Sequence, residues 1–482
     1  MLHRLIALSL SQRLLVLLAA LAIAVGGALT FQSLPIDAFP DVSSTQVKII
    51  MKAPGMTPEE VETRVTAPIE REMLGIPNQR VVRSQSKYAI ADITLDFEEG
   101  TDIYWARQQV NERLSGVLAN LPNTIYGGLA PITTPLGEVF MFTIEGDISL
   151  TEKRTLLDWT IRPVLRSIKG VADVNVLGGM VKSFEVIPDM AALAGRSISL
   201  AELQQALEVN NRSDGAGRIS ENEEALLVRT EGNIRTLDDV RAISLGMRGG
   251  LPVRVGDVAV VQIGSLTRYG SVTKDGKDEA VEGLVLSLRG ANARELVDNV
   301  SEQIKELNQQ LPKGVVIKPF YNRGDLVERA IGTVTKALAE AIVLVLILLF
   351  LFLGNLRAAF VVAVILPLSA LSTFVLMHFF GLSANLMSLG GLAIAIGLLV
   401  DAAVVVVENI EARIAERKHQ ELSLPNLILQ AASEVAAPVT AGIAIIVIVF
   451  LPLLSLQGLE GKLFTPVALT IVFALASSLI YR

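Results

Sequence analysis

Two carboxylates, Asp401 and Glu408, lie in an apolar stretch of the sequence, residues 386–409. Asp401 stands inside a run long enough to cross a bilayer as a helix, where a charged side chain costs on the order of 3 kcal/mol or more. Glu408 follows seven residues later, so a helix places it roughly 10 Å along the same face. Because ionisable residues inside a membrane are functional as a rule, the pattern predicts a carboxylate pair that relays protons or binds a cation.

Each of these side chains also has a structural interpretation. Asp401 could be held by a neighbouring lysine, serine or backbone group with no part in transport. Glu408 could be an interfacial carboxylate at the cytoplasmic end of the helix. Asn409, which follows, is expected to end the helix or to pack. We take Asp401 as the first proton-relay candidate and Glu408 as the second.

Side chains that bind metals are scarce in this chain. There is no cysteine and there are three histidines, which excludes thiolate sites and a histidine cluster. Met377, beside His378, and Met387 are candidates for a metal or substrate pathway, because thioethers bind soft metal ions. Packing is the alternative for each methionine. The metal stays unassigned, and no cofactor is predicted.

The composition indicates a membrane protein with a large aqueous part. Of the 482 residues, 51% are hydrophobic and 19% are charged, which is too apolar for an ordinary soluble protein and too charged for membrane spans alone. No basic tract suggests a nucleic-acid partner. No G-x-x-x-x-G-K-[ST] loop, the mark of an ATP-driven pump, occurs in the sequence. These features favour a secondary transporter over an enzyme.

Six apolar runs predict a polytopic α-helical membrane protein. The first comprises residues 14–34, and five more follow residue 324, at about 337–353, 358–379, 386–409, 435–456 and 464–481. Small residues such as Gly390, Gly391 and Gly397 let neighbouring helices approach closely, so the fourth span is expected inside a helix bundle.

Positive charges predict the orientation. Arg4 and Arg13 place the N-terminus in the cytoplasm, and Arg357 and residues 413–418 then fall on the same side. Residues 35–324 contain no run of span length, so they lie outside, in the periplasm of a Gram-negative cell. Their strand and helix patterns predict an α+β domain in which a β-α-β-β-α order, typical of a split βαβ unit, recurs around an inserted subdomain.

Three motifs resemble those of the resistance–nodulation–division (RND) efflux permeases. They are residues 35–41 (PIDAFPD) at the exit from the first helix, residues 54–62 (PGMTPEEVE) in the first porter helix, and residues 397–409 (GLLVDAAVVVVEN) in the fourth span. The resemblance covers essentially all 482 residues and matches the N-terminal half of such a permease. Multidrug members carry two adjacent acids in the fourth span, whereas Asp401 is followed by Ala402. This resembles the heavy-metal efflux branch, with its copper/silver and cobalt-zinc-cadmium exporters.

The resemblance implies a division of the chain into ferredoxin-like porter repeats, a docking subdomain and the spans. The ranges are residues 1–34, the N-terminus and first span; 35–131, the first porter subdomain; 132–189 with 277–324, the second; 190–276, the docking subdomain; and 325–482, the remaining spans. It also implies a homotrimer in the bacterial inner membrane that works with a periplasmic adaptor and an outer-membrane channel, exports a metal cation and is driven by proton influx. A loop near residues 210–218 would reach the neighbouring subunit.

The sequence departs from the copper/silver exporters at two positions. Leu399 and Val406 stand where those exporters place methionines, and Met387 alone matches. Since thioethers select monovalent copper and silver, a divalent ion or a broader range becomes plausible. The chain stops at the end of an apolar run, so we expect a truncated or split product whose missing half supplies a lysine partner for Asp401. A multidrug permease, a lipid or protein-export relative, and a non-transporting assembly subunit remain as alternatives.

Overall fold

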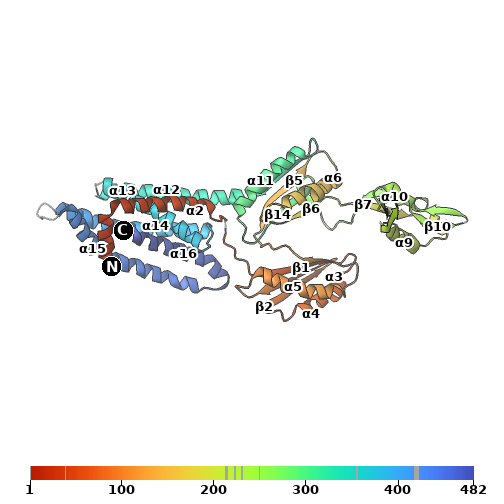
Figure 1. Ribbon diagram of the computed structural model, residues 1–482, viewed down its shortest axis with the longest axis horizontal. Coiled ribbons are helices and arrows are strands. Elements are labelled where there is room, and N and C mark those ends of the chain that lie inside the picture. The colour runs from red at the N-terminus through yellow and green to blue at the C-terminus, as the bar shows by residue number, and fades with distance from the viewer. Residues whose placement is uncertain are drawn as a thin grey trace.

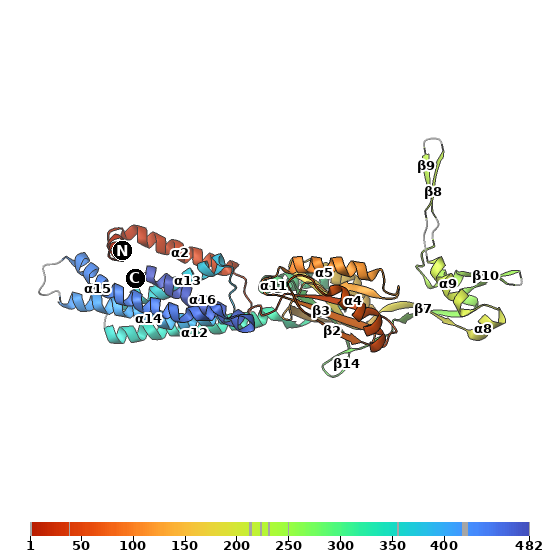
Figure 2. The same ribbon diagram turned by 90° about the horizontal axis from the view of Figure 1, so that it is seen from below.

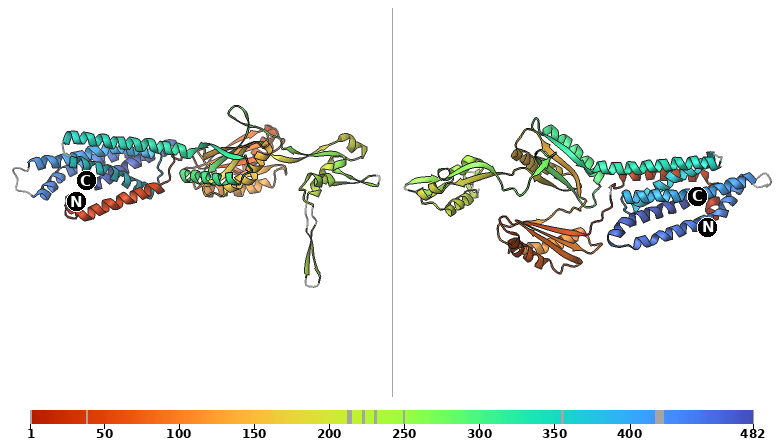
Figure 3. Two further views of the ribbon diagram at one scale, coloured as in Figure 1. Left: turned by 90° about the horizontal axis from the view of Figure 1, so that it is seen from above. Right: turned by 180° about the vertical axis from the view of Figure 1, so that it is seen from behind.

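The computed structural model describes residues 2–37, 39–211, 215–221, 224–229, 232–248, 250–353, 356–416 and 423–481. Its long helices form a bundle at one end, two α/β units follow, and a smaller unit lies at the far end (Figure 1). Both ends of the chain lie in the helical bundle, as two further views show (Figure 3). The predicted combination of several apolar helices with mixed α/β structure is confirmed.

The bundle contains helices from both ends of the sequence. They are α1 (Leu2–Ser11), α2 (Arg13–Ser33), α12 (Arg323–Leu353), α13 (Leu356–Phe379), α14 (Leu386–Ala415), α15 (Leu424–Phe450) with the 3₁₀ turn η5 (Leu451–Ser455), and α16 (Gly458–Ile480). Five of the described helices are long and apolar enough to cross a membrane: α2, α13, α14, α15 with η5, and α16. The predicted span 337–353 is the C-terminal part of α12, which is not among these five. The count of six spans therefore stays a prediction.

Two helix ends differ from the predicted spans. α14 continues to Ala415 instead of ending at residue 409, and α15 begins at Leu424 instead of residue 435. The earlier start follows from Pro425 in the first turn, where its missing N–H is no loss. Leu427 and Ala431 in this added part are buried, so packing of its apolar face extends the helix.

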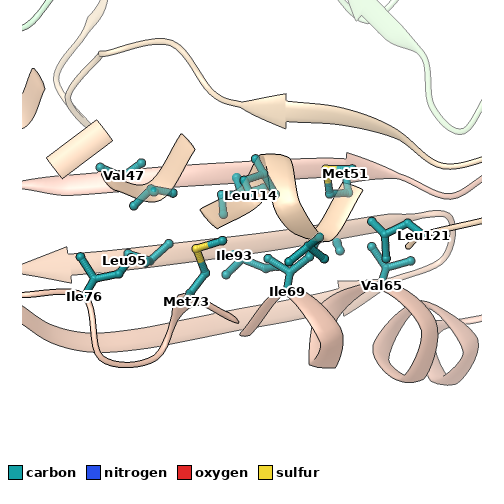
Figure 4. Close-up of a cluster of buried hydrophobic side chains, with 14 of the residues drawn as sticks. Val47, Met51, Val65, Ile69, Met73, Ile76, Ile93, Leu95, Leu114 and Leu121 are labelled. Carbon is teal, nitrogen blue, oxygen red and sulfur yellow. The ribbon is translucent and has the colours of Figure 1, made fainter. Parts of the chain in front are cut away.

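The first α/β unit has the element order β-α-β-β-α-β. Its elements are β1 (Gln46–Lys52), α3 (Pro58–Val61), the π-helical turn η1 (Glu62–Thr66), α4 (Ala67–Met73), β2 (Gln79–Lys87), β3 (Ile90–Phe97), α5 (Ile103–Leu118) and β4 (Tyr126–Leu129). The strands form an antiparallel sheet in the order β2-β3-β1-β4. Alternating apolar residues of the strands pack against the helices in one core (Figure 4).

The second α/β unit repeats this order around a long insertion. Its elements are β5 (Glu138–Glu145), α6 (Leu150–Leu156), the π-helical turn η2 (Leu157–Ile161), α7 (Arg162–Arg166), β6 (Val171–Gly178), β14 (Asp278–Ser287), α11 (Ala293–Gln310) and β15 (Val316–Asn322). The antiparallel order is β6-β14-β5-β15, and β13 (Val272–Lys274) forms a hairpin with β14. The two units thus share strand order and helix placement.

A π-helical turn occurs at the same place in both units. Pro68 follows η1 by two residues, and Pro163 follows η2 by two residues. Proline has no N–H for the regular helical hydrogen bond, and a π turn lets the helix continue past the missing donor. The capping boxes Thr57–Glu60 and Ser149–Glu152 start both segments. The two units therefore share this local detail as well as their strand order.

The insertion between β6 and β14 forms the distal unit. Its elements are β7 (Lys182–Pro188), α8 (Met190–Gly195), α9 (Leu200–Asn210), β8 (Gly215–Glu221), β9 (Glu224–Arg229), α10 (Leu237–Ala242), β10 (Ser244–Arg248), β11 (Leu251–Arg254), η3 (Val255–Asp257) and β12 (Ala259–Ser265). β7 pairs with β12, and this ribbon joins the distal unit to the second α/β unit. The loop expected near residues 210–218 is in part strand β8, which forms a projecting hairpin with β9 (Figure 2); residues 212–214 lie outside the described residues.

Strand β4 was not predicted, because its sequence is rich in glycine. Glycine is depleted in strands, since it brings no side chain to pack. Here Gly127 lies directly against β1: a Cβ at this position would be 2.2 Å from the carbonyl oxygen of Ile50. Close approach to the neighbouring strand therefore requires glycine at a position that local propensity disfavours.

Candidate functional site

Helix α14 carries both candidate carboxylates and packs against α12, α13, α15 and α16. One face of α14 is buried in the bundle, at Ser388, Leu392, Ala395, Leu399 and Ala403. The spacing of three and four residues is that of a single helix face. The helix begins at Asn385, whose side-chain oxygen accepts hydrogen bonds from the backbone N–H groups of Met387 and Ser388, each at 3.0 Å.

Asp401 and Glu408 lie on the opposite face of α14. This face also carries Gly397 and Val405, and all four residues are exposed in the described chain. Among the described residues, the side chain of Asp401 has no hydrogen-bond or ion-pair partner. The helix is unbroken between the two carboxylates, so they follow one another along one surface that the other described helices leave open.

Of the three glycines predicted to let neighbouring helices approach the fourth span, only Gly391 lies in such a contact within the described chain, whereas a Cβ at Gly390 or Gly397 would meet no atom within 4 Å. A Cβ added at Gly391 would lie 2.8 Å from the backbone oxygen of Val467 on α16. At Gly27 on α2 it would lie 2.7 Å from the backbone oxygen of Leu371 on α13. These two glycines set the spacing of the helix pairs, because any side chain there would push the backbones apart.

The C-terminal end of α14 is fastened to α15. Asn409 donates a hydrogen bond to the carbonyl oxygen of Ala431 at 2.7 Å. One helical turn further, Arg413 donates to both carboxylate oxygens of Glu434, at 3.0 and 3.1 Å. Asn409 therefore has the packing role that was one of its two predicted roles, and it does not end the helix, which continues to Ala415.

The methionine candidates occupy different surroundings. Met377 is 0% exposed and belongs to the apolar core of the bundle, whereas the adjacent His378 is exposed. The two side chains thus face different environments, which favours packing for Met377. Met387 is half-buried in the first turn of α14. Within the described ranges, no group of three or more His, Cys, Asp or Glu side chains is placed to hold a metal ion.

The face of the second sheet that is turned away from its helices carries a carboxylate with a perturbed pKa. In β14, Val281 and Val285 are buried against the helices. Because successive residues of a strand point to opposite faces, Glu282, which follows Val281, points to the other face of the sheet. Burial raises the pKa of Glu282, and the nearby negative charge of Glu138 raises it further. Neither residue was singled out from the sequence, because strand alternation alone does not show which carboxylates become close.

Glu282→Gln is expected to stabilise the protein at neutral pH by at most about 1 kcal/mol, because the side chain is partly exposed to solvent. The raised folded-state pKa means that the fold disfavours the charged form. The free energy of unfolding of the wild type therefore rises as pH falls through the folded-state pKa of Glu282. Below pH 4.5, the ordinary pKa of a glutamate, Glu282 is protonated in both states, and the wild type should be as stable as the glutamine variant. Thermal unfolding of both proteins between pH 4 and 8 measures this. A gap that stays constant with pH would show that ionisation is not its cause.

A buried arginine links the bundle to the second α/β unit. Arg323, the first residue of α12, is 5% exposed and pairs with Asp37 at 2.8 Å. It also donates a hydrogen bond to the carbonyl oxygen of Leu136. This contact could not be predicted from the sequence, because its partners are distant in the chain and no local pattern connects them.

The comparisons with known proteins agree on one family. Residues 5–482 match the family model described as the AcrB/AcrD/AcrF family. Protein HelA of Legionella pneumophila is 43% identical over an alignment of 495 positions, which covers 100% of this chain and 47% of HelA. The cobalt-zinc-cadmium resistance protein CzcA of Cupriavidus metallidurans is 41% identical (100% of this chain, 46% of CzcA), and the cation efflux system protein CusA of Escherichia coli K12 is 38% identical (98% and 46%).

The fold comparison gives the same result. A crystal structure of a heavy metal efflux pump superposes with a TM-score of 0.90 at 36% identity, over 99% of this chain and 47% of that one. The chain thus spans about half the length of the relatives it matches. It belongs to the AcrB/AcrD/AcrF family of RND permeases, membrane-embedded transporters, and its relatives include heavy-metal efflux pumps.

Proposed function

We propose that this chain forms the N-terminal half of a proton-driven efflux permease that exports heavy-metal cations by cation/proton antiport. The observation that carries the proposal is the carboxylate face of α14. Asp401 and Glu408 follow one another along an apolar helix of span length, on the side that the described helices leave uncovered. A carboxylate in a membrane helix is usually paired with another polar or charged group. The relatives are about twice as long as this chain, and their additional residues could supply such a group.

In this mechanism Asp401 takes up a proton from the periplasmic side and releases it toward the cytoplasm. Protonation removes a charge from apolar surroundings, so it changes the free energy of packing this face of α14 against a neighbour. A basic side chain from the remainder of the permease would stabilise the ionised form. Glu408 acts as a second relay group nearer the C-terminal end of the helix.

The proposed substrate is a divalent transition-metal ion. Leu399 is fully buried in the bundle and Val406 is aliphatic, so neither offers the sulfur ligands that select monovalent copper and silver. The similarity to a cobalt-zinc-cadmium resistance protein supports the same class. Met387, which is half-buried, remains the candidate for a metal pathway through the membrane part, whereas we assign Met377 a packing role.

The aqueous part is proposed to lie in the periplasm. The two α/β units, with their shared strand order, would be ferredoxin-like porter subdomains, and the distal unit would be the docking subdomain. The permease would be a homotrimer in the inner membrane, with a periplasmic adaptor and an outer-membrane channel as partners. The projecting β8–β9 hairpin would contact the neighbouring subunit.

Transport by the full-length permease tests the substrate. Cells that lack their own metal exporters would be given the permease and scored for zinc, cobalt, cadmium, nickel, copper and silver tolerance, and for dye efflux. We expect protection against at least one divalent metal and no dye efflux. Dye efflux without metal tolerance would instead favour a multidrug permease, and neither activity would favour a non-transporting assembly subunit.

A further inference from the structure

We propose that Arg323 is a positioning residue that couples the carboxylate helix α14 to the second α/β unit, through Asp37 on one side and Leu136 on the other. The inference rests on the proposed function, because coupling requires that protonation and metal binding occur in one cycle. It adds a specific connection between the two, built from residues that are far apart in the sequence.

The guanidinium of Arg323 joins three segments of the chain. Its Nε and Nη2 donate to the same carboxylate oxygen of Asp37, at 3.0 and 2.8 Å. Its Nη1 donates to the carbonyl oxygen of Leu136. Asp37 belongs to the exit from α2, and Leu136 to the loop before β5. Since Arg323 is 5% exposed, water is largely excluded, and its planar, fork-shaped donor set fixes the relative positions of these segments.

Asp37 is in turn joined to the beginning of α14. Its backbone N–H donates to the carbonyl oxygen of Ala384 at 3.1 Å, and the N–H of Ala384 donates to the carbonyl oxygen of Pro35 at 2.9 Å. Ala384 is 0% exposed and directly precedes Asn385, the N-cap of α14. Asp401 lies on the same helix, about 24 Å further along at 1.5 Å per residue. A shift of α14 along its axis therefore moves the segment that holds Asp37.

On the other side, Arg323 is attached to the sheet of the second unit at two strands. β15 ends at Asn322, directly before Arg323. Leu136 lies two residues before β5, which pairs with both β14 and β15. A displacement of Arg323 would therefore move both β5, in the centre of this sheet, and β15, at its edge. The series of contacts from α14 to this sheet contains covalent bonds, backbone hydrogen bonds and one ion pair, in which Arg323 is 5% exposed and Asp37 is 32% exposed.

A second ion pair at the same junction provides a matched control. Arg289 pairs with Asp41 at 3.0 Å and donates to the carbonyl oxygen of Ser43 at 3.1 Å. The chemistry is the same, but the Arg289 side chain is 25% exposed against 5% for Arg323. Within the described part of the chain, the side-chain bonds of Arg289 go to Asp41, Ser43 and Ser44 and none reaches residues 384–385. It should contribute to packing without transmitting the state of α14.

The test measures whether metal binding changes the protonation of Asp401. A hydrophobic carbodiimide modifies protonated carboxyl groups, and mass spectrometry of the full-length permease reports modification of Asp401 against pH, with and without zinc, cobalt or cadmium. In the wild type we expect one of these metals to shift the midpoint of the curve of Asp401 modification against pH. The proton concentration at the midpoint should change by about 5-fold or more, which is the usual lower limit of a coupling between two sites. In Arg323→Lys, which keeps the charge but loses the fork, we expect a shift of less than about 2-fold, with pH-dependent labelling retained. Asp41→Asn should keep the wild-type shift.

Each other outcome has a definite meaning. A wild-type shift in Arg323→Lys overturns the inference, as does the absence of any metal effect in the wild type. If Arg323→Lys does not fold, Asp37→Asn, which keeps an acceptor oxygen of the same shape, takes its place with the same criterion. If labelling of Asp401 does not depend on pH, or if Asp401→Asn still exports metal, the proposed function fails instead, independently of Arg323.

Discussion

Asp401→Asn is expected to reduce proton-coupled metal export by about 100-fold or more, the lower range for removal of a proton-transferring group. Asparagine has the same shape as aspartate and remains polar, but it cannot take up or release a proton. Its amide oxygen can still accept a hydrogen bond from a basic partner, and the melting temperature of the purified variant separates a loss of transport from a loss of folding. Initial rates of metal uptake into inside-out membrane vesicles, with a proton gradient imposed, measure the effect.

Two variants on the same helix are controls for this prediction. Asp401→Glu keeps a titratable carboxyl and should retain measurable export. Glu408→Gln removes the second carboxylate of the same face and should cost less than Asp401→Asn, since Glu408 lies two turns closer to the C-terminal end of α14. Export by Asp401→Asn within about 2-fold of the wild type would contradict a proton role for Asp401.

Gly391→Leu is expected to destabilise the helix bundle by about 1–3 kcal/mol, the usual cost of inserting atoms into a packed interior. A Cβ at this position would lie 2.8 Å from the backbone oxygen of Val467 and 3.1 Å from its Cα. Backbone atoms cannot turn away as a flexible side chain does, so α14 and α16 must separate. The melting temperature of the purified permease in detergent measures the loss, and export should fall with it because α14 carries the carboxylates.

The neighbouring glycine provides the comparison. A Cβ at Gly390 meets no atom within 4 Å, and both substitutions make the same gain in helix propensity. The difference in melting temperature between Gly391→Leu and Gly390→Leu therefore isolates packing against α16. Equal melting temperatures would show that the close approach of α14 and α16 is not what stabilises the bundle.

Features that depend on local periodicity could be predicted from the sequence. The start of the fourth span at residue 386 agrees with α14, because a long apolar run is a local signal. The shared face of Asp401 and Glu408 follows from their spacing once the helix is given. The family was likewise recognisable from short motifs, and the match over residues 5–482 confirms it.

Features that depend on contacts between distant segments could not be predicted. β7 follows β6 along the chain, yet it pairs with β12 of the distal unit. The ion pair of Arg323 with Asp37 joins residues 286 positions apart, and each residue alone resembles an ordinary charged side chain beside a membrane span. The length of α15 was also underestimated, because buried contacts extend it through a segment with exposed polar residues on its other side. In each case the strand pairing, the ion pair or the helix length is determined by tertiary packing, and the local sequence pattern does not specify it.

In the proposed mechanism, an inward proton movement drives the export of a metal cation. The most direct measurement uses proteoliposomes that contain the full-length permease and an internal zinc- or cobalt-sensitive dye, with equal metal concentrations on both sides and an imposed pH difference. We predict net metal movement opposite to the proton gradient, abolished by a protonophore and by Asp401→Asn. Metal movement that requires a metal gradient and is unaffected by the pH difference would contradict cation/proton antiport.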